Sequence, residues 1–186
     1  DMNGDGIVNE KDRIIIGRGL PKHIGGFNNN LSYKGLSLNV FFQWSYGNDL
    51  FNANRDMFEG NALTRSNLNQ YATYVNRWTP ENPSNEYYRF GGQGPTGRFS
   101  SRAIEDGSFL RLKTVSLSYA LPKIVLSKMR LRSFSLFATA QNLYTWTKYS
   151  GMDPEVSVAN SILTPGFDYS AYPREQTFVF GLKASL

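Results

Sequence analysis

The chain has no cysteine, a single histidine and few charged side chains. Acidic and basic residues together make up 19% of its 186 residues. Without cysteine, neither disulfides nor thiolate metal sites can form. No apolar run approaches the length of a membrane-spanning helix, about 18 residues. The sequence therefore excludes a disulfide-stapled domain and a helical membrane protein.

The chain also lacks a catalytic motif and a dense basic stripe. Asp153 and Glu155 are neighbouring carboxylates, but no partner histidine or nucleophile motif accompanies them, so we interpret them as turn residues. The lone His23 lies in a glycine- and proline-rich stretch and is interpreted as a loop residue. The net charge of +5 comes from scattered basic residues. We therefore predict no catalytic residues and no nucleic-acid partner.

The most informative stretch runs from Phe109 to Trp146, where apolar and small polar residues alternate with a period of two. Residues two apart share a face of a strand, so the stretch predicts two strands, each with one oily and one polar face. A short turn beginning at Pro122 joins them. Phe137 interrupts the second polar face. The oily faces carry Val115, Leu117, Tyr119, Leu121, Phe134, Leu136, Ala138 and Ala140.

Similar alternation marks residues 27–50 and the last strand, 175–186. The pair Lys34-Gly35 predicts a two-residue hairpin turn, in which glycine accepts a positive φ. From Leu36 to Tyr46 the strand is long for a soluble protein and matches a tilted membrane strand of about 9–11 residues. A soluble sheet with one buried face shows this pattern. A transmembrane barrel shows it too, with its oily face toward lipid and its polar face toward the lumen.

The connections between these strands alternate in length. Short turns at 34–35 and 122–130 alternate with long connections at 51–107 and 148–174. Outer-membrane barrels combine short turns on one side with long loops on the other, whereas a soluble sandwich has no reason to do so. The alternation therefore favours a barrel. Within 51–107, a short helix capped by Ser66 is predicted from apolar residues at helical spacing, Leu68, Tyr71, Ala72, Val75 and Trp78.

The first twelve residues, DMNGDGIVNEKD, have the spacing of a calcium loop. Calcium takes six to eight oxygen ligands, and alternate residues of a tight loop bring such oxygens together. Gly6 permits the sharp turn. The alternative is a turn-rich loop without an ion, because asparagine, aspartate and glycine also dominate ordinary turns. The predicted ligands are Asp1, Asn3, Asp5, the Ile7 carbonyl, Asn9 and Asp12.

Several motifs together resemble the C-terminal end of the SusC/RagA family of TonB-dependent outer-membrane transporters. They lie in family order over essentially the whole chain, which opens inside a loop, so we expect a longer parent protein. One departure is Leu186, where the family usually ends on phenylalanine. The motifs are DMNGDGIVNEKDRIIIG (1–17), GGFNNNLSYKGLSLNVFFQWSYGNDLFN (25–52), RWTPENP (77–83), SSRAIEDGSFLRLKTVSLSYALP (100–122), AQNLYTWTKYSGMDPEVS (140–157) and YPREQTFVFGL (172–182).

The resemblance implies an all-β fold, the C-terminal antiparallel strands (about five) of a large transmembrane β-barrel with long extracellular loops. Such a chain would not close a barrel alone and would be stable only within its parent. Its segments would be an extracellular calcium-loop-like segment (1–22), a hairpin (23–50), an extracellular loop with a short helix (51–107), a second hairpin (108–147), an extracellular loop (148–174) and the last strand (175–186).

For function, the resemblance implies import of oligosaccharides or oligopeptides across a Gram-negative outer membrane. The expected partners are a SusD-like surface lipoprotein, the TonB complex acting on a missing N-terminal part, and outer-membrane lipid. Calcium is the one cofactor predicted. The alternative is a soluble calcium-binding β module for carbohydrate binding or cell-surface adhesion. The substrate-binding residues are not identified by the sequence.

Overall fold

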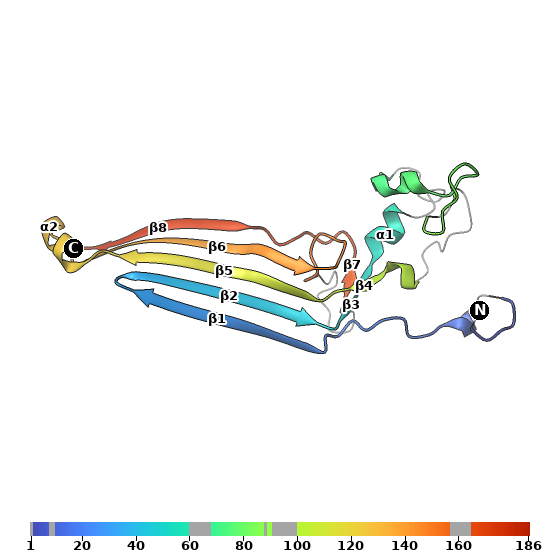
Figure 1. The fold of residues 1–186 in the computed structure, drawn as a ribbon, viewed down its shortest axis with the longest axis horizontal. Helices are drawn as coiled ribbons and strands as arrows, with labels where there is room; N and C mark the ends of the chain where they lie inside the picture. The colour runs from blue at the N-terminus through green and yellow to red at the C-terminus, as the bar shows by residue number, and fades with distance from the viewer. Residues whose placement is uncertain (1, 8–9, 60–67, 88, 91–99, 157–164) are drawn as a thin grey trace. The chain divides into compact units, whose positions relative to one another are not determined.

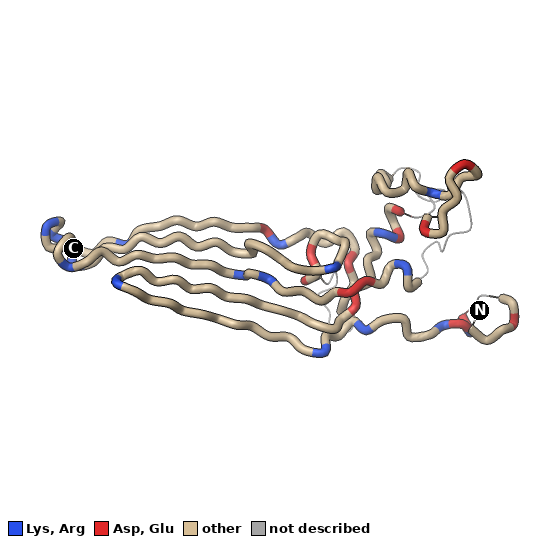
Figure 2. Tube along the Cα trace, in the orientation of Figure 1, with Lys and Arg blue, Asp and Glu red and all other residues tan. Residues whose placement is uncertain are grey.

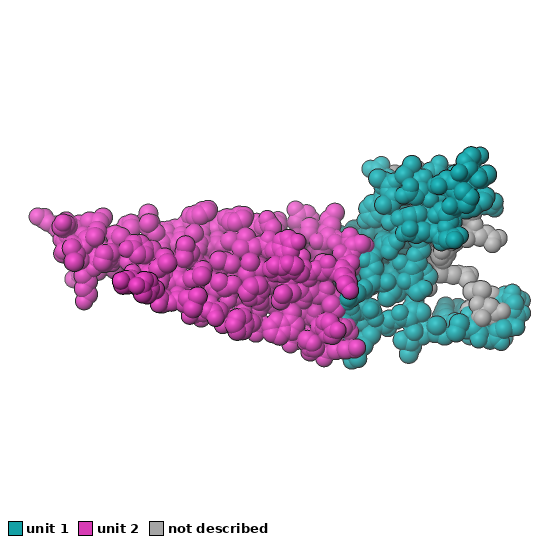
Figure 3. Space-filling model, in the orientation of Figure 1, with its two compact units in different colours: residues 1–20, 48–106, 156–171 teal, residues 21–47, 107–155, 172–186 magenta. Residues whose placement is uncertain are grey.

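The computed structural model describes residues 2–7, 10–59, 68–87, 89–90, 100–156 and 165–186. The chain divides into two compact units, which Figure 3 colours separately. We call residues 21–47, 107–155 and 172–186 the sheet unit, and residues 1–20, 48–106 and 156–171 the loop unit. Among the described residues, no helix is long and apolar enough to cross a membrane.

The sheet unit is built on one antiparallel five-stranded sheet with the order β1-β2-β5-β6-β8 (Figure 1). Every neighbouring pair is antiparallel, so the chain runs up and down through the sheet. This confirms the predicted set of about five antiparallel strands. The strands are β1 (His23–Tyr33), β2 (Leu36–Tyr46), β5 (Phe109–Ala120), β6 (Ser133–Thr147) and β8 (Thr177–Ser185).

Two short connections join strands at one end of the sheet, which we call the short-turn end. Lys34 and Gly35 connect β1 to β2 with φ values of 44° and 86°. Two consecutive positive φ values give a turn whose twist matches that of the strands. The other connection contains α2 (Lys123–Met129), which ends at Arg130 in the left-handed conformation. The opposite end, where β2 and β6 finish, is the long-loop end.

Charge is almost absent from the strands, as Figure 2 shows. β1, β2 and β6 contain no Asp, Glu, Lys or Arg, β5 contains Arg111 and Lys113, and β8 contains Lys183. The apolar side chains of the oily face are half-buried or exposed, up to 77% for Phe180. A soluble sheet buries such a face under a second layer. Among the described residues no second layer covers this sheet, so its oily face is left for an apolar environment.

A bulge in β5 changes which face its residues share. The register against β2 shifts between Leu112 and Thr114, so Lys113 is the extra residue. Strict alternation would place Arg111 on the same face as Val115, which is oily. The bulge reverses the alternation and moves Arg111 to the polar face, where it bonds Thr145. The irregularity therefore keeps a charge off the oily face.

The loop unit holds the remaining short elements. Its three-stranded sheet has the order β4-β3-β7, with β3 and β7 parallel. The elements are η1 (Glu10–Asp12), β3 (Asp49–Asn52), α1 (Ala53–Phe58), η3 (Ala72–Asn76), η4 (Ser101–Ala103), β4 (Ile104–Asp106) and β7 (Phe167–Asp168).

The helix predicted between Ser66 and Trp78 takes a different form. Ser66 lies outside the described residues, and the described part of this stretch contains the short 3-10 helix η3. Tyr71 and Arg77 have extended ψ values of 145° and 153°, which prevents an α-helix from running through either of them. A short α-helix does lie in this connection, but at α1, where the Asn52 side chain accepts a hydrogen bond from the Arg55 N–H.

The buried carboxylate of Glu59, the residue after α1, links separate segments of the loop unit. Glu59 accepts from Arg55 Nε at 3.0 Å, from Arg102 Nη2 at 3.2 Å and from the Thr73 hydroxyl at 3.2 Å. Burial lowers the pKa of Arg55, but hydrogen bonds and charge from Glu59 and Glu105 outweigh burial and raise it above its ordinary value. These contacts join segments more than forty residues apart in the chain, such as Glu59 and Arg102.

Candidate functional site: the polar face of the sheet

Small polar side chains on the polar face bond one another across neighbouring strands. Asn39 Nδ2 on β2 donates to the Oδ1 atoms of Asn28 and Asn30 on β1, at 2.7 and 2.6 Å. Ser116 on β5 and Thr139 on β6 share a hydrogen bond of 2.8 Å. Cross-strand pairs of this kind stabilise a sheet and keep hydrogen-bonding groups along its surface. The polar face is therefore suited to water and to polar solutes.

Two phenylalanines interrupt this polar face, and each covers a glycine on the adjacent strand. A Cβ atom on Gly181 would lie 2.4 Å from Cζ of Phe137, and one on Gly26 would lie 2.8 Å from Cε2 of Phe41. The rings thus lie where a side chain would otherwise stand. Aromatic residues packed over strand glycines pin the register of a sheet. Phe41 and Phe137 are therefore packing partners of glycines rather than faults in the pattern.

An arginine is buried on the polar face near the long-loop end. Arg111 is 2% exposed. Its guanidinium group binds Asp153 through Nη2. Nη1 of the same group lies 3.1 Å from Glu155 Oε2, and Nε donates to the Thr145 hydroxyl at 3.0 Å. Nε, Nη1 and Nη2 of Arg111 therefore each have an acceptor. A buried guanidinium charge is stable only when its donors are paired in this way.

The same carboxylates bind the returning end of the 148–174 connection. Arg174 donates its backbone N–H to Asp153 Oδ2 at 3.0 Å, and its Nε lies 3.0 Å from Glu155 Oε2. Burial alone would raise the pKa of Asp153. The backbone N–H groups of Glu155 and Arg174 and the Arg111 guanidinium together hold that pKa below its ordinary value. We call Arg111, Asp153, Glu155 and Arg174 the rim cluster.

Sequence reasoning missed the rim cluster. Asp153 and Glu155 do form a turn, since the Glu155 N–H bonds Asp153 Oδ1 at 2.8 Å, but both carboxylates also pair with Arg111. The pairing joins residues more than forty positions apart, so local spacing does not reveal it. A usable signal was present: Arg111 is a charge inside a long strand, and such a charge requires a partner.

Aromatic residues gather on the oily face at the long-loop end. Trp44 donates from Nε1 to His23 Nδ1 at 3.2 Å, and His23 stacks on Tyr46 with ring centroids 5.1 Å apart. Tyr144 and Trp146 meet edge to face at 4.8 Å. Aromatic belts of this kind lie at the interface between membrane and water. His23, interpreted from the sequence as a loop residue, is the first residue of β1 and part of this belt.

The predicted calcium loop is a tight turn held by its own side chains. Asp12 Oδ1 accepts from the backbone of Met2 at 2.8 Å and of Asn3 at 3.3 Å. Asp5 Oδ1 accepts from the Ile7 N–H at 2.9 Å. Two of the predicted ligands, Asp1 and Asn9, lie outside the described residues. Within the described part of the chain, no group of three or more His, Asp or Glu side chains is arranged to hold a metal ion.

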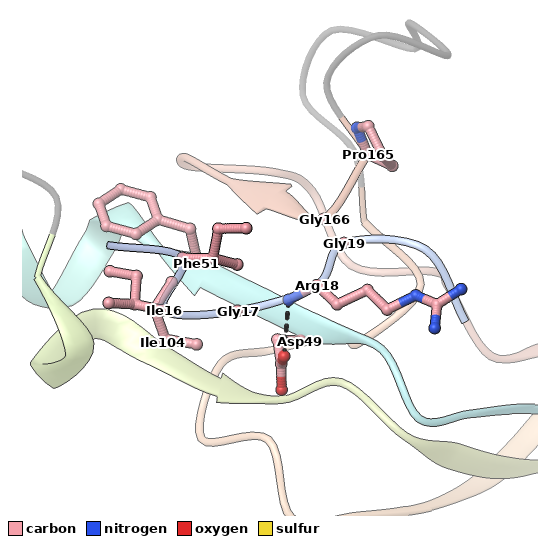
Figure 4. Close-up of a pocket in the computed structure, with 10 residues that line it drawn as sticks. Ile16, Gly17, Arg18, Gly19, Asp49, Phe51, Ile104, Pro165 and Gly166 are labelled. Atoms are coloured by element: carbon pink, nitrogen blue, oxygen red, sulfur yellow. Dashed lines mark hydrogen bonds between the residues drawn. The ribbon is translucent and has the colours of Figure 1, made fainter. Parts of the chain in front are cut away.

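A shallow cavity of about 260 Å³ lies in the loop unit (Figure 4). Arg18 N donates to Asp49 Oδ2 at 2.8 Å, and Asp49 N donates to Arg18 O at 2.7 Å. The Arg18 side chain points away from Asp49 in Figure 4. The walls are otherwise backbone and apolar side chains, including Phe51 and Ile104. This cavity presents no convergent set of polar groups, so it is not assigned to a ligand.

The chain is similar to several TonB-dependent receptors, although no family model matches it. TonB-dependent receptor P26 of Formosa agariphila is 35% identical over 100% of this chain and 19% of its own length. TonB-dependent receptor SusC of Bacteroides thetaiotaomicron is 26% identical over 98% of this chain and 17% of its own. The chain thus spans about a fifth of the length of the curated relatives it matches.

Solved structures agree. The RagAB peptide importer in its closed-closed state matches 100% of this chain and 20% of its own chain, with a TM-score of 0.80 and 29% identity. A second RagAB peptide transporter structure matches 88% of this chain with a TM-score of 0.75 and 32% identity. The relatives are receptors and transporters, not enzymes. Over its whole length the chain is similar to the C-terminal part of TonB-dependent outer-membrane receptors of the SusC and RagA kind, and its sheet corresponds to strands of their transmembrane β-barrel.

Proposed function

We propose that the protein containing this chain imports oligosaccharides or oligopeptides across the outer membrane, using energy transmitted by TonB. The observation that carries the proposal is the match of the whole chain to the RagAB peptide importer, with a TM-score of 0.80. Because the chain spans 20% of that importer chain, the substrate and the energised step belong to the longer protein.

The two faces of the sheet support a place for this chain in the wall of a transport passage. The oily face, with exposed side chains such as Phe180 and Leu182, would contact lipid. The polar face, with the Asn39 and Ser116 hydrogen bonds, would line the passage. Transmembrane barrels require this alternation because lipid and water meet opposite sides of each strand. The connections at the long-loop end would then lie outside the cell.

The family resemblance adds a surface partner to the proposal. A SusD-like lipoprotein would cover the outer mouth and capture substrate, and the TonB complex would act on the part of the protein that precedes this chain. The runner-up, a soluble calcium-binding module, is not supported, because the exposed oily face has no second layer among the described residues.

Uptake by the native host tests this function. Fluorescent oligosaccharide and oligopeptide mixtures would be supplied separately to cells with and without the full-length gene, and again after removal of TonB. We expect one mixture to be accumulated only when both the gene and TonB are present. Co-purification of a surface lipoprotein with the tagged transporter would support the partner. Equal uptake of both mixtures in all strains would refute the proposal.

We also propose that the first twelve residues bind calcium. The support is the oxygen spacing together with the turn geometry, in which Gly4 and Gly6 have φ values of 76° and 80°. Binding would stabilise the ordered form of this loop. Calorimetric titration of the full-length protein in detergent tests this, with Asp5→Ala as the binding variant and Glu10→Ala as the control. Absence of a calcium signal at millimolar concentration in the unaltered protein would refute it.

A further inference from the structure

The rim cluster covers one spot of a sheet that is otherwise a single open layer. Arg111 is 2% exposed, and Phe109 on the same strand is 7% exposed. In the connection that follows β6, Tyr149 and Asp153 are each 5% exposed. Elsewhere in the strands of the sheet unit, the described side chains are half-buried or exposed. Side chains on a one-layer sheet become buried only when another part of the chain lies over them. For Arg111 that part is the segment 148–155, whose Asp153 and Glu155 bind its guanidinium group.

Contacts fix the side of the sheet on which this segment lies. Thr145, which accepts from Arg111 Nε, is on the polar face of β6. Gln43, on the polar face of β2, donates from Nε2 to Glu155 Oε1 at 3.5 Å and accepts from Lys113 Nζ. The carboxylates of Asp153 and Glu155 therefore bind side chains of β5 and β2 on the polar face, although their segment starts at the end of β6.

Both stems of one connection are fastened at this point. The outgoing stem supplies Asp153 and Glu155, and the returning stem supplies Arg174, whose backbone and side chain bind these two carboxylates. Lysine at position 111 could not replace the arginine, because three acceptors in fixed directions need the guanidinium fork. Removing one partner from such a buried group leaves charge without compensation, and the arrangement opens.

We propose that the rim cluster is a clamp that folds the segment 148–155 inward over the polar face and so narrows the outer mouth of the passage. Arg111 is the positioning residue, and the segment is the constriction. The narrowing of a passage rests on the proposed transport function, whereas the folding of the segment over β5 can be measured without transport.

Cysteine labelling in the full-length protein in intact cells tests the clamp. Phe109 is 7% exposed, and its ring centroid lies 5.3 Å from the guanidinium carbon of Arg111. Phe109→Cys, as the sole cysteine, therefore places a buried thiol beside the clamp, and a membrane-impermeant maleimide reports its exposure from outside. Asp153→Asn and Glu155→Gln each weaken the clamp without touching position 109. We expect labelling at least about tenfold faster in the Asp153→Asn background, and a smaller acceleration with Glu155→Gln.

The control is Arg13→Met, which removes an ion pair with Glu10 whose two side chains are 77% and 84% exposed. Labelling should be unchanged there. If Asp153→Asn fails to assemble, Glu155→Gln carries the test, because the Glu155 side chain is 24% exposed and tolerates the change better. Unchanged labelling in assembled clamp variants would overturn the inference. Uptake of substrate in the same strains decides the transport function separately.

Discussion

At the scale of residues, glycines determine where aromatic rings lie on the polar face. Phe137 faces Gly181 directly in the register of β6 and β8. The Phe137 ring occupies the space that a side chain at position 181 would take, so the ring can lie there only because residue 181 is glycine. The same holds for Phe41 and Gly26. A ring that looks misplaced in an alternating sequence can therefore indicate a glycine on the adjacent strand.

This pairing predicts strong coupling between positions 137 and 181. Gly181→Ala should destabilise the full-length protein by about 1–3 kcal/mol, because the new Cβ would lie 2.4 Å from the Phe137 ring. In a Phe137→Ala background the same change should cost little. Unfolding in detergent micelles with urea, measured for the four variants of the cycle, gives the coupling energy. Additive effects would contradict direct packing of the ring on the glycine.

Asp153 gives a prediction for pH. Its folded pKa lies below the ordinary value of 3.8, so its contribution to stability is fully present above about pH 4 and is lost as pH falls through the folded pKa. The difference in melting temperature between the unaltered protein and Asp153→Asn should be constant from about pH 5 to 7 and shrink below about pH 4.

Thermal unfolding of the full-length protein in detergent measures this difference. Glu10→Gln is the matched control, because the Glu10 side chain is 84% exposed and should show no comparable loss. A difference in melting temperature that grows on acidification would contradict the lowered pKa of Asp153.

At the scale of elements, β5 shows how one extra residue makes a charged strand compatible with a membrane. Its bulge at Lys113 places Leu110 and Leu112 on the oily face and Arg111 on the polar face. The sequence alone, read with a period of two, places Arg111 beside Val115. The β1–β2 hairpin has no bulge, so its residues alternate between the faces as a period of two predicts. The turn residues Lys34 and Gly35 fix its register.

The two faces of β5 should respond differently to the same charge. Leu117→Arg places a guanidinium on the oily face and should reduce the stability of the inserted barrel by about 2–4 kcal/mol, enough to lower its amount in the outer membrane sharply. Ser118→Arg, one residue away on the polar face, is the matched control. Heat-modifiable mobility of the full-length protein in outer-membrane fractions measures assembly. Equal loss for both variants would contradict the assignment of faces.

At the scale of the whole molecule, the sheet has two edges that no strand of the described chain covers, β1 and β8. Open edges and an exposed oily face both favour association. Residues 1–186 expressed alone should therefore give no monodisperse monomer in detergent-free buffer. Size-exclusion chromatography with light scattering decides this, with full-length protein in detergent as the control. A stable 21.0 kDa monomer would contradict the expectation.

Alternation, turn residues and the order of short and long connections were enough to predict the five antiparallel strands and the barrel class. These are local properties, because the period of a strand and the φ of a turn depend on neighbouring residues. The ion proposed for the first twelve residues stays a prediction. The short helix predicted within 51–107 is present, but the stretch around Tyr71 forms a 3-10 helix, because helical spacing does not reveal that Tyr71 and Arg77 are extended.

Contacts between distant segments explain the residues that depart from the alternating pattern. Arg111 binds Asp153, which in turn binds Arg174, and Phe137 covers Gly181, across separations that no local period encodes. Alternation along the chain is enough to give each strand an oily and a polar face. The bulge in β5 and the return of the 148–155 segment decided which charges the polar face carries, because buried charge is stable only where distant partners converge on it.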